Sequence, residues 1–179
     1  MCEITLTAQK AGCKNVGGIE SFYLIDKQAR LDSSIAFAVT GGLLAMLGTD
    51  SVDAYHFIPR VGTVTFTQPR TDDNVAGTSF VTQTLEFTLN KYTSETVVLN
   101  EMIAKGKLEV FLTYADGTFA YAGLDATGME SNGGDAGFSG TAKGDAVGQT
   151  YTLTSESATV APIAVFTELD TSFTIVEPS

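Results

Sequence analysis

The chain has 179 residues, of which 44% are hydrophobic and 17% are charged, and its formal net charge is −11. This length suits one domain with a sizeable core. The acidic balance argues against nucleic-acid binding through a basic patch and against docking on an anionic membrane. Abundant Thr and Gly residues indicate a compact β protein with many turns rather than a disordered chain.

Residues 1–16 are expected to form an N-terminal arm. They contain no basic segment followed by an apolar one, so we expect no signal peptide. Cys2 and Cys13 are expected to be free thiols of a protein that folds in a reducing cytoplasm, with a disulfide or a metal pair as the alternatives. Because His56 is the only histidine, the two thiols cannot complete a four-ligand zinc site without carboxylates.

The first predicted strand spans Gly18–Asp26 and is followed by a polar loop over residues 27–34. A hairpin is expected within residues 35–50, because apolar residues alternate on both sides of the Gly41-Gly42 pair. A short buried helix is the alternative. We interpret residues 35–50 as an insertion, and their apolar stretch is shorter than the roughly 20 residues that cross a bilayer.

Two more strands, Val52–Ile58 and Val61–Thr67, lead to a polar loop over Gln68–Gly77. Thr78–Asn90 is the clearest long strand, since apolar and polar side chains alternate along it with a period of two residues. The apolar side is expected to hold Val81, Leu85, Phe87 and Leu89, and the polar side is expected to hold Thr82, Thr84, Glu86 and Thr88.

One helix is predicted, over Ser94–Lys105. Ser94 is a good N-cap residue, and Gly106 is typical of the position that follows a last helical turn. We expect one apolar face of the helix to pack on the side of the sheet that holds Leu85 and Phe87. The residues of this face are Val98, Leu99, Met102 and Ile103.

The last part of the chain predicts a hairpin and two further strands around a glycine-rich loop. The Asp116-Gly117 pair between two alternating runs is a strong hairpin signal. Residues 125–148 hold many glycines and few apolar side chains, which favours a loop. The strands are expected at Lys107–Tyr114, Thr118–Leu124, Gln149–Ser157 and Ser172–Val176.

No catalytic, cofactor or metal site is expected. His56 lies between aromatic residues in a predicted strand, so we interpret it as structural, and replacing it with Gln should leave any activity intact. The glycine-rich segment does not match a phosphate-binding loop, because Lys143 precedes Gly144 rather than Ser or Thr. The spacing of its acidic residues differs from an EF-hand, although paired carboxylates for glycoside hydrolysis stay open. These acidic residues are Asp125, Glu130, Asp135 and Asp145.

Four stretches of the sequence carry a resemblance to a known family. They read GCKNVGGI at Gly12–Ile19, then TQTLEFTLNKYTSE, KGKLEVFLTYADGTFAYAGL and AKGDAVGQTYTLTSESATVAPI. Their wording and order, over roughly residues 12–165, resemble the virion structural proteins of tailed bacteriophages, of the tail-tube or tail-ring type and including gut phages. The shared pattern is a long strand, one helix, an Asp-Gly hairpin and a glycine-rich loop that leads to another strand.

This resemblance implies a mainly β fold, a β-sandwich or barrel-like arrangement of antiparallel sheets, with one flanking α-helix. It implies a non-enzymatic subunit of the virion, made in the host bacterial cytoplasm, that assembles into a ring or tube with copies of itself and other tail or connector proteins. DNA then crosses the lumen as cargo without specific binding. The alternatives are another virion component, such as a head decoration or fibre-base protein, and a β-sandwich binding module for glycan or protein.

The candidate residues for subunit contacts lie in the polar loop Gln68–Gly77, which is expected to have little of its own domain to pack against. The arm at residues 1–16 is a second candidate. Proline limits the flexibility of the loop, and its charged residues offer both signs to a partner. The candidate residues are Gln68, Pro69, Arg70, Asp72 and Asp73.

Overall fold

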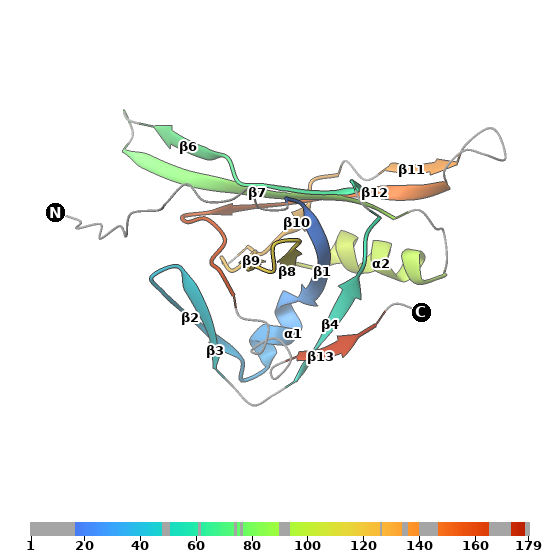
Figure 1. Cartoon of the computed structure of the whole chain (residues 1–179), viewed down its shortest axis with the longest axis horizontal. Coiled ribbons are helices and arrows are strands. Elements are labelled where there is room, and N and C mark those ends of the chain that lie inside the picture. Colours follow the sequence, from blue (N-terminus) through green and yellow to red (C-terminus); the bar gives the residue numbers. More distant parts are fainter. Residues whose placement is uncertain are drawn as a thin grey trace.

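The computed structural model describes residues 17–47, 51–60, 62–73, 75, 77–89, 94–125, 127–133, 136–139, 147–164 and 173–177. These residues form a mainly β structure of thirteen strands and two helices (Figure 1). The strands are β1 (Ile19–Asp26), β2 (Ala36–Thr40), β3 (Leu43–Leu47), β4 (Val52–Phe57), β5 (Val64–Thr67), β6 (Arg70–Asp73), β7 (Thr78–Leu89), β8 (Leu108–Tyr114), β9 (Phe119–Ala122), β10 (Glu130–Ser131), β11 (Ala136–Ser139), β12 (Val147–Ser157) and β13 (Phe173–Val176), and the helices are α1 (Lys27–Asp32) and α2 (Ser94–Lys105).

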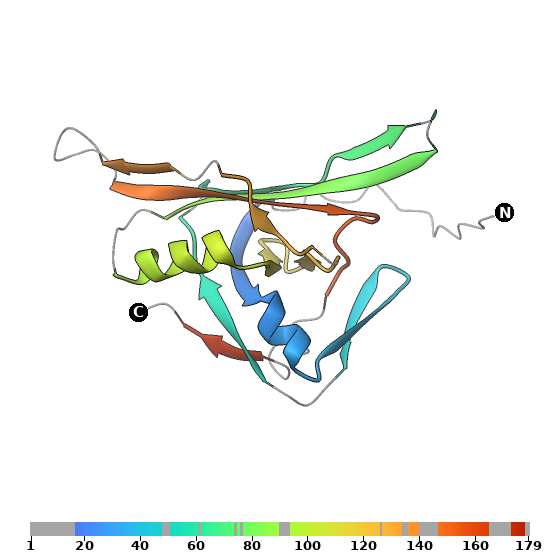
Figure 2. The ribbon, with the colours of Figure 1, turned by 180° about the vertical axis from the view of Figure 1, so that it is seen from behind.

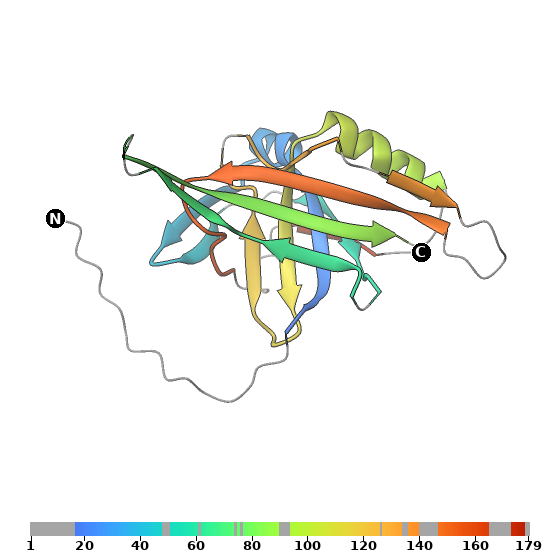
Figure 3. The same cartoon turned by 90° about the horizontal axis from the view of Figure 1, so that it is seen from above.

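The predicted mainly β class with antiparallel sheets is confirmed, and within the described residues the sheets do not close into a barrel. One sheet has six strands in the order β10-β12-β7-β5, with β11 also on β12 and β6 also on β7. The other has five strands in the order β13-β4-β1-β8-β9. Figure 3 shows the long strands β7 and β12 running across β1 and β8, so the two sheets pack crosswise.

The five-stranded sheet is extended at its β9 edge by the chain after β12. The amide of Tyr121 donates to the carbonyl of Pro162 at 3.0 Å, and the amide of Ala164 donates to that of Phe119 at 3.1 Å. On its other side, the same segment accepts from the amide of Leu44 through the carbonyl of Ile163 at 2.8 Å. The β2–β3 hairpin therefore continues this layer, which runs from β13 at one end to β2 at the other.

The main core lies between the two sheets. Leu85 and Phe87 of β7 meet Phe22 of β1 and Leu112 of β8, and all four side chains are fully buried. Helix α2 lies beneath the six-stranded sheet and adds its own side chains to this core (Figure 2). Alternation of buried and exposed residues along β7 follows the prediction, because a strand presents successive side chains to opposite faces.

The bounds of α2 are confirmed, but the predicted burial of one residue on its apolar face is wrong. Leu99 and Ile103 are buried in the core and Met102 packs against it, whereas Val98 is 69% exposed. Leu99 and Ile103 lie one turn apart and continue the stripe that begins at the buried Thr96, and Val98 lies about 100° away from that stripe.

A second cluster covers the opposite face of the five-stranded sheet. It joins Tyr23 and Ile25 of β1 to Phe111 and Tyr121, and Phe173 of β13 completes it. Figure 2 shows that α1, the hairpin and β13 lie on the far side from the six-stranded sheet. The inner strands β1 and β8 are consequently buried on both faces, which explains their nearly continuous apolar sequence.

The loop predicted over residues 27–34 is wrong, because this segment contains helix α1. The side chain of Asp26 caps the helix by accepting a hydrogen bond from the amide of Gln28 at 2.8 Å. The buried residues of α1 are Lys27 and Arg30. A helix whose buried face is charged carries no apolar periodicity, so the pattern that predicts helices is missing here.

The two predicted hairpins are confirmed. Gly41 and Gly42 have φ angles of 61° and 84°, the left-handed values that both central residues of a type I′ turn require. In the second hairpin, Gly117 has a φ of 82°, and the amide of Tyr114 donates to the carbonyl of Thr118 at 2.9 Å. The remaining predicted strands are present, although the one expected at Val61–Thr67 is limited to β5.

Two segments predicted as loops contain strands. The loop at Gln68–Gly77 includes β6, which pairs with β7, and the glycine-rich residues 125–148 include β10 and β11, which pair with β12. Their short sequences, rich in Asp, Glu, Ala and Gly, have little strand propensity, so the long neighbouring strands impose the conformation. Several residues weighed in the sequence lie outside the described part of the chain: residues 1–16 with Cys2 and Cys13, and Asp135, Lys143, Gly144 and Asp145.

Candidate functional site

The outer face of the six-stranded sheet is the most distinctive surface of the described residues. The register places threonines side by side across it: Thr84 of β7 lies opposite Thr154 of β12 and Thr67 of β5. Thr88 and Thr150 also lie opposite each other, with 3.0 Å between their hydroxyl oxygens. The threonines of this face are Thr65, Thr67, Thr71, Thr78, Thr82, Thr84, Thr88, Thr150, Thr152 and Thr154.

The charged groups on this face are all carboxylates among the described strand residues. Glu86 and Glu156 are exposed near its middle, and Asp73 is exposed on β6. Glu130 is on the edge strand β10. It pairs with Lys107, the residue before β8, with 3.4 Å between Nζ of Lys107 and Oε1 of Glu130. Lys and Arg do not occur at the outward positions of the described strands, so the threonine face carries a negative potential.

The candidate contact residues divide into an anchored pair and an exposed group. The side-chain oxygen of Gln68 accepts from the amide of Ala161 at 2.6 Å, and the carbonyl of Pro69 accepts from the amide of Thr82 at 3.0 Å. Gln68 therefore binds the chain after β12 and Pro69 binds β7, and the expectation that the whole segment has little to pack against is wrong.

Arg70, Asp72 and Asp73 are exposed on β6. The guanidinium Nε of Arg70 donates to Asp72 at 2.9 Å and to the Ser79 hydroxyl at 3.0 Å. The hydrogen bond from Ser79, followed by that from Arg70, lowers the pKa of Asp72. These contacts bring Arg70 and Asp72 together on one side of the strand pair, and a role for the three residues in subunit contacts stays a prediction.

β6 and the first residues of β7 form a ribbon that projects beyond the body of the molecule (Figure 1). All described residues of β6, and the first three of β7, are exposed. The ribbon includes two apolar side chains in contact with solvent, Phe80 and Val75. A ribbon of two strands with no packed face has little stability of its own, so this end of the protein is suited to a partner surface.

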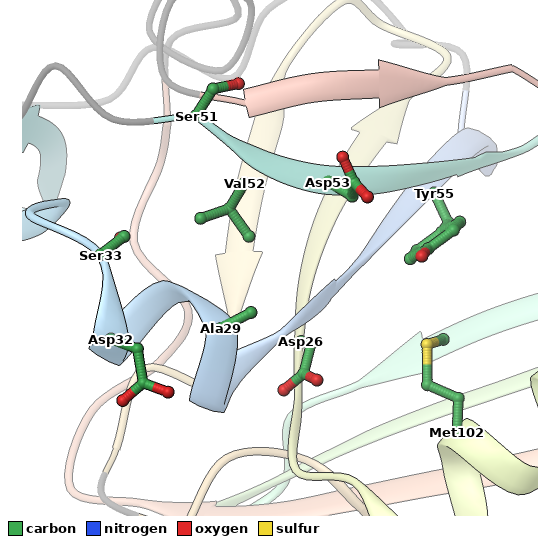
Figure 4. Close-up of a pocket in the computed structure, with 9 residues that line it drawn as sticks. All are labelled: Asp26, Ala29, Asp32, Ser33, Ser51, Val52, Asp53, Tyr55 and Met102. Atoms are coloured by element: carbon green, nitrogen blue, oxygen red, sulfur yellow. The ribbon is translucent and has the colours of Figure 1, made fainter.

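A groove of about 570 Å³ opens between α1, β4 and α2. Figure 4 shows the carboxylates of Asp26, Asp32 and Asp53 around it, with Tyr55 and Met102 at one end. Within the described residues, no group of His, Cys, Asp or Glu side chains has an arrangement that could hold a metal ion. The groove is an open acidic surface whose side chains come from elements far apart in the sequence.

His56 lies in a contact between two strands. Its Nδ1 is 2.8 Å from a carboxylate oxygen of Glu177, which follows β13, and its ring stacks on that of Tyr23 with 4.4 Å between centroids. The other ring nitrogen, Nε2, is buried and has no hydrogen-bond partner among the described residues. Because Nε2 is closed off from solvent, it has no access to a substrate.

A buried charge cluster was not predicted from the sequence. The carboxylate of Glu109 is fully buried and accepts from Nε and Nη2 of Arg30 at 2.6 and 2.7 Å, and from the Tyr121 hydroxyl at 2.9 Å. Nζ of Lys27 is 3.1 Å from the same carboxylate and donates to the carbonyl of Gly123 at 2.8 Å. Nζ of Lys27 also donates to the carbonyls of Leu124 and Asp125, so every charge in the cluster has partners.

Burial, and then the neighbouring charge of Glu109, raises the pKa of Tyr121 well above its ordinary value. The cluster fastens α1 to β8 and β9, and it is enclosed by protein. One signal in the sequence points to it: Glu109 interrupts the otherwise apolar run LEVFLTY, and a carboxylate at such a position needs a buried partner.

No protein-family model, curated protein or solved structure matches the chain. Neither described helix has the length and apolar character needed to cross a membrane.

Proposed function

We propose that the protein is a structural subunit of a bacteriophage tail, which assembles with copies of itself into a ring or tube through which DNA passes. The threonine face of the six-stranded sheet is the observation that carries this proposal. A lumen for DNA requires a surface that phosphates do not bind, and this face offers hydroxyls and carboxylates without a cation among its described strand residues.

The electrostatics of the face suit a passing polyanion. Carboxylates at Glu86 and Glu156 repel phosphates that come within the Debye length, which is about 8 Å at physiological salt. Threonine hydroxyls keep the surface hydrated, and phosphate binding in proteins depends on Lys, Arg or helix N-termini that this face lacks in its described strands. DNA is accordingly cargo in this proposal and is not a specific ligand.

The proposal includes the absence of an enzymatic role. The single histidine, His56, is engaged with Glu177 and Tyr23, and its free nitrogen is buried, which supports a structural role. The partners are copies of the chain and other tail or connector proteins, and no cofactor is required. The protein is made in the host bacterial cytoplasm and is incorporated into the virion.

Assembly and DNA binding together test the proposal. Purified protein is measured by mass photometry over a range of concentrations and imaged by negative-stain electron microscopy, with DNA mobility shifts at about 0.15 M salt. We expect rings or tubes that do not retain DNA. A protein that stays monomeric at every concentration, or that binds duplex DNA tightly at this salt, contradicts the proposal.

A binding module for glycan or protein is the second candidate. The acidic groove favours it, because Tyr55 supplies a ring and three aspartates supply hydrogen-bond acceptors of the kind that bind sugar hydroxyls. A screen against an oligosaccharide array distinguishes the two functions. Binding by a monomer that is lost on Tyr55→Ala, with no change in melting temperature, favours the module over the tail subunit.

A further inference from the structure

The layer that contains the five-stranded sheet ends in two outer strands, β2 and β13. β2 pairs with β3 and β13 pairs with β4, and no described strand pairs with the outer side of either. Each outer strand therefore presents backbone amides and carbonyls along one side. In folded proteins such edges are usually blunted by charged side chains, proline or bulges, because an open edge pairs with other chains.

Neither of these outer strands carries a charge or a proline. β2 has the sequence AFAVT and β13 has the sequence FTIV, and their Phe, Val, Thr and Ile residues favour strands. In the other sheet, Pro69 precedes the edge strand β6, which holds Arg70, Asp72 and Asp73. Its outer strand β5 (VTFT) also lacks charge, but Val64 and Phe66 of β5 pack against the main core.

Exposed apolar side chains lie beside both unprotected edges. Near β2, Val39 is 52% exposed, and Leu43 of β3, which lies opposite Thr40, is 55% exposed. Near β13, Val176 lies opposite Tyr55 of β4. Val176 is 38% exposed and Tyr55 is 36% exposed. Burial of these groups would add apolar contacts to the backbone hydrogen bonds of a new strand pair.

The two edges lie at opposite ends of one layer, which decides the kind of assembly they can form. Figure 1 shows β2 on the side of the projecting β6–β7 ribbon, whereas β13 lies on the other side of α1. A contact that joins one end of a copy to the other end of the next is heterologous, and it produces a ring when its rotation closes. The ribbon then reaches the same neighbour as β2.

We propose that copies of this chain join by pairing β2 of one copy with β13 of the next, so that the layer continues from subunit to subunit. This inference rests on the proposed self-assembly and names the surface that performs it. Strand pairing supplies the backbone hydrogen bonds, and the apolar side chains beside the two edges are buried between the copies.

Two single variants test the pairing. Val39→Lys places a cation on the β2 edge, and Val176→Lys places one on the β13 edge, which is how natural edge strands avoid pairing. Each variant alone is expected to be monomeric by mass photometry. An equimolar mixture is expected to form a one-to-one dimer and nothing larger, because β2 of the Val176→Lys chain and β13 of the Val39→Lys chain remain intact.

Val98→Lys is the matched control, since it places the same cation at an exposed valine of α2 away from both edges. It should assemble like wild type, and all three variants should have the far-UV circular dichroism spectrum of wild type. Assembly of both single variants contradicts the edge pairing while leaving the proposed function intact. A dimer of Val39→Lys alone indicates β13–β13 pairing instead, and a wild type that never assembles refutes the proposed function itself.

Thiol crosslinking gives a second measurement if a lysine variant fails to fold. In a chain with Cys2→Ser and Cys13→Ser, the pair Val39→Cys and Val176→Cys should give a ladder of linked chains with a short bifunctional maleimide. The pair Val98→Cys and Val176→Cys should give much less of the ladder. Equal ladders from the two pairs overturn the proposal.

Discussion

Glu109 is a carboxylate with no exposure to water, and three side chains from two elements neutralise it and donate to it. Glu109→Gln removes the negative charge but leaves Lys27 and Arg30 buried. We expect the free energy of unfolding to fall by about 3 kcal/mol or more, as it does when one partner of a buried ion pair is removed. Urea denaturation at pH 7, followed by circular dichroism, measures this loss.

Glu101→Gln is the control for this prediction. Glu101 also pairs with a lysine, at 3.3 Å from Lys105, but both side chains are largely exposed. Exposed pairs of this spacing contribute about 0.3–0.5 kcal/mol, so the control should unfold close to wild type. Equal effects of the two substitutions contradict the view that the buried cluster stabilises the fold.

Tyr121 is expected to make the free energy of unfolding decrease as the pH rises in the alkaline range. Its pKa is raised in the folded state, first by burial and then by the charge of Glu109, so its proton is held there. In the unfolded chain the phenol ionises near pH 10, and above that pH the folded state binds more protons than the unfolded state. The stabilisation is complete below about pH 10 and is lost as the pH rises further.

Tyr121→Phe removes this titration together with the hydroxyl that donates to Glu109. We expect the variant to be less stable at pH 8, by about 1.5–3 kcal/mol for the lost hydrogen bond to a charged group. Between pH 9.5 and 11 its urea midpoint should fall less steeply than that of wild type. Parallel slopes in this range contradict the assignment of the alkaline loss to Tyr121.

For a single residue, the sequence shows that a charge lies in an apolar segment but does not show which residues pair with it. Glu109 stands out in an apolar strand, yet its partners Lys27 and Tyr121 come from segments 82 and 12 positions away along the numbering. Such pairing depends on the topology. The same reason hides the contact of His56 on β4 with Glu177, which follows β13, because β4 and β13 meet only in the folded sheet.

Among the elements, α2 shows how a helix can be placed correctly and rotated wrongly. Its capping residues and final glycine predict both ends, since these are local signals. Four neighbouring apolar residues do not determine which of two adjacent stripes is buried. The structure buries the stripe of Leu99 and Ile103, and Val98 faces solvent.

Leu99→Ala and Val98→Ala should therefore differ in their effect on the free energy of unfolding. Removal of the buried Leu99 side chain is expected to lower the free energy of unfolding by about 2–4 kcal/mol, because the core loses contacts and gains a cavity. Val98→Ala should be neutral or slightly stabilising, since Ala has the higher helix propensity at an exposed position. Thermal and urea unfolding of the two variants compare them, and a larger loss from Val98→Ala overturns this orientation of the helix.

The elements that the sequence did not predict are those whose conformation depends on a neighbour. β6, β10 and β11 have only two to four residues each, and each pairs with the long strand β7 or β12. Helix α1 is defined by a cap and by two buried cations rather than by apolar periodicity. Strands that alternate clearly, such as β7 and β12, were predictable because their pattern is set by their own residues.

For the whole molecule, alternation along β7 predicted a polar side, but the threonine face exists only because β5 and β12 align their own threonines with it. The order of strands, including the parallel pairing of β13 with β4, has no local signal. Topology of this kind follows from long-range contacts, which a single sequence does not display.

Reversing the charge of the threonine face should make the assembly retain DNA. In the double variant Glu86→Lys and Glu156→Lys, two cations replace two carboxylates in the middle of the face. We expect DNA to bind at low salt and to be released as salt rises, because counterion release drives such binding. Mobility shifts and filter binding at several salt concentrations measure the effect.

The control is the double variant Glu20→Lys and Glu101→Lys, which has the same net charge but changes exposed residues of β1 and α2. It should retain far less DNA than the face variant. Equal retention by both variants shows that net charge alone governs DNA binding, which contradicts a specific role for the face.

The rows of threonines also determine how the sheet surface behaves mechanically. A threonine side chain has one heavy-atom torsion, which branching at Cβ holds in few rotamers, whereas lysine or glutamate side chains lose about 1–2 kcal/mol of conformational entropy when they are immobilised. A polymer that moves along the face therefore contacts side chains that are nearly fixed, and few long side chains are ordered and released at each step. In the proposed tail lumen, fixed side chains of this kind lower the friction on passing DNA, and this effect persists at high salt, where charge repulsion is screened.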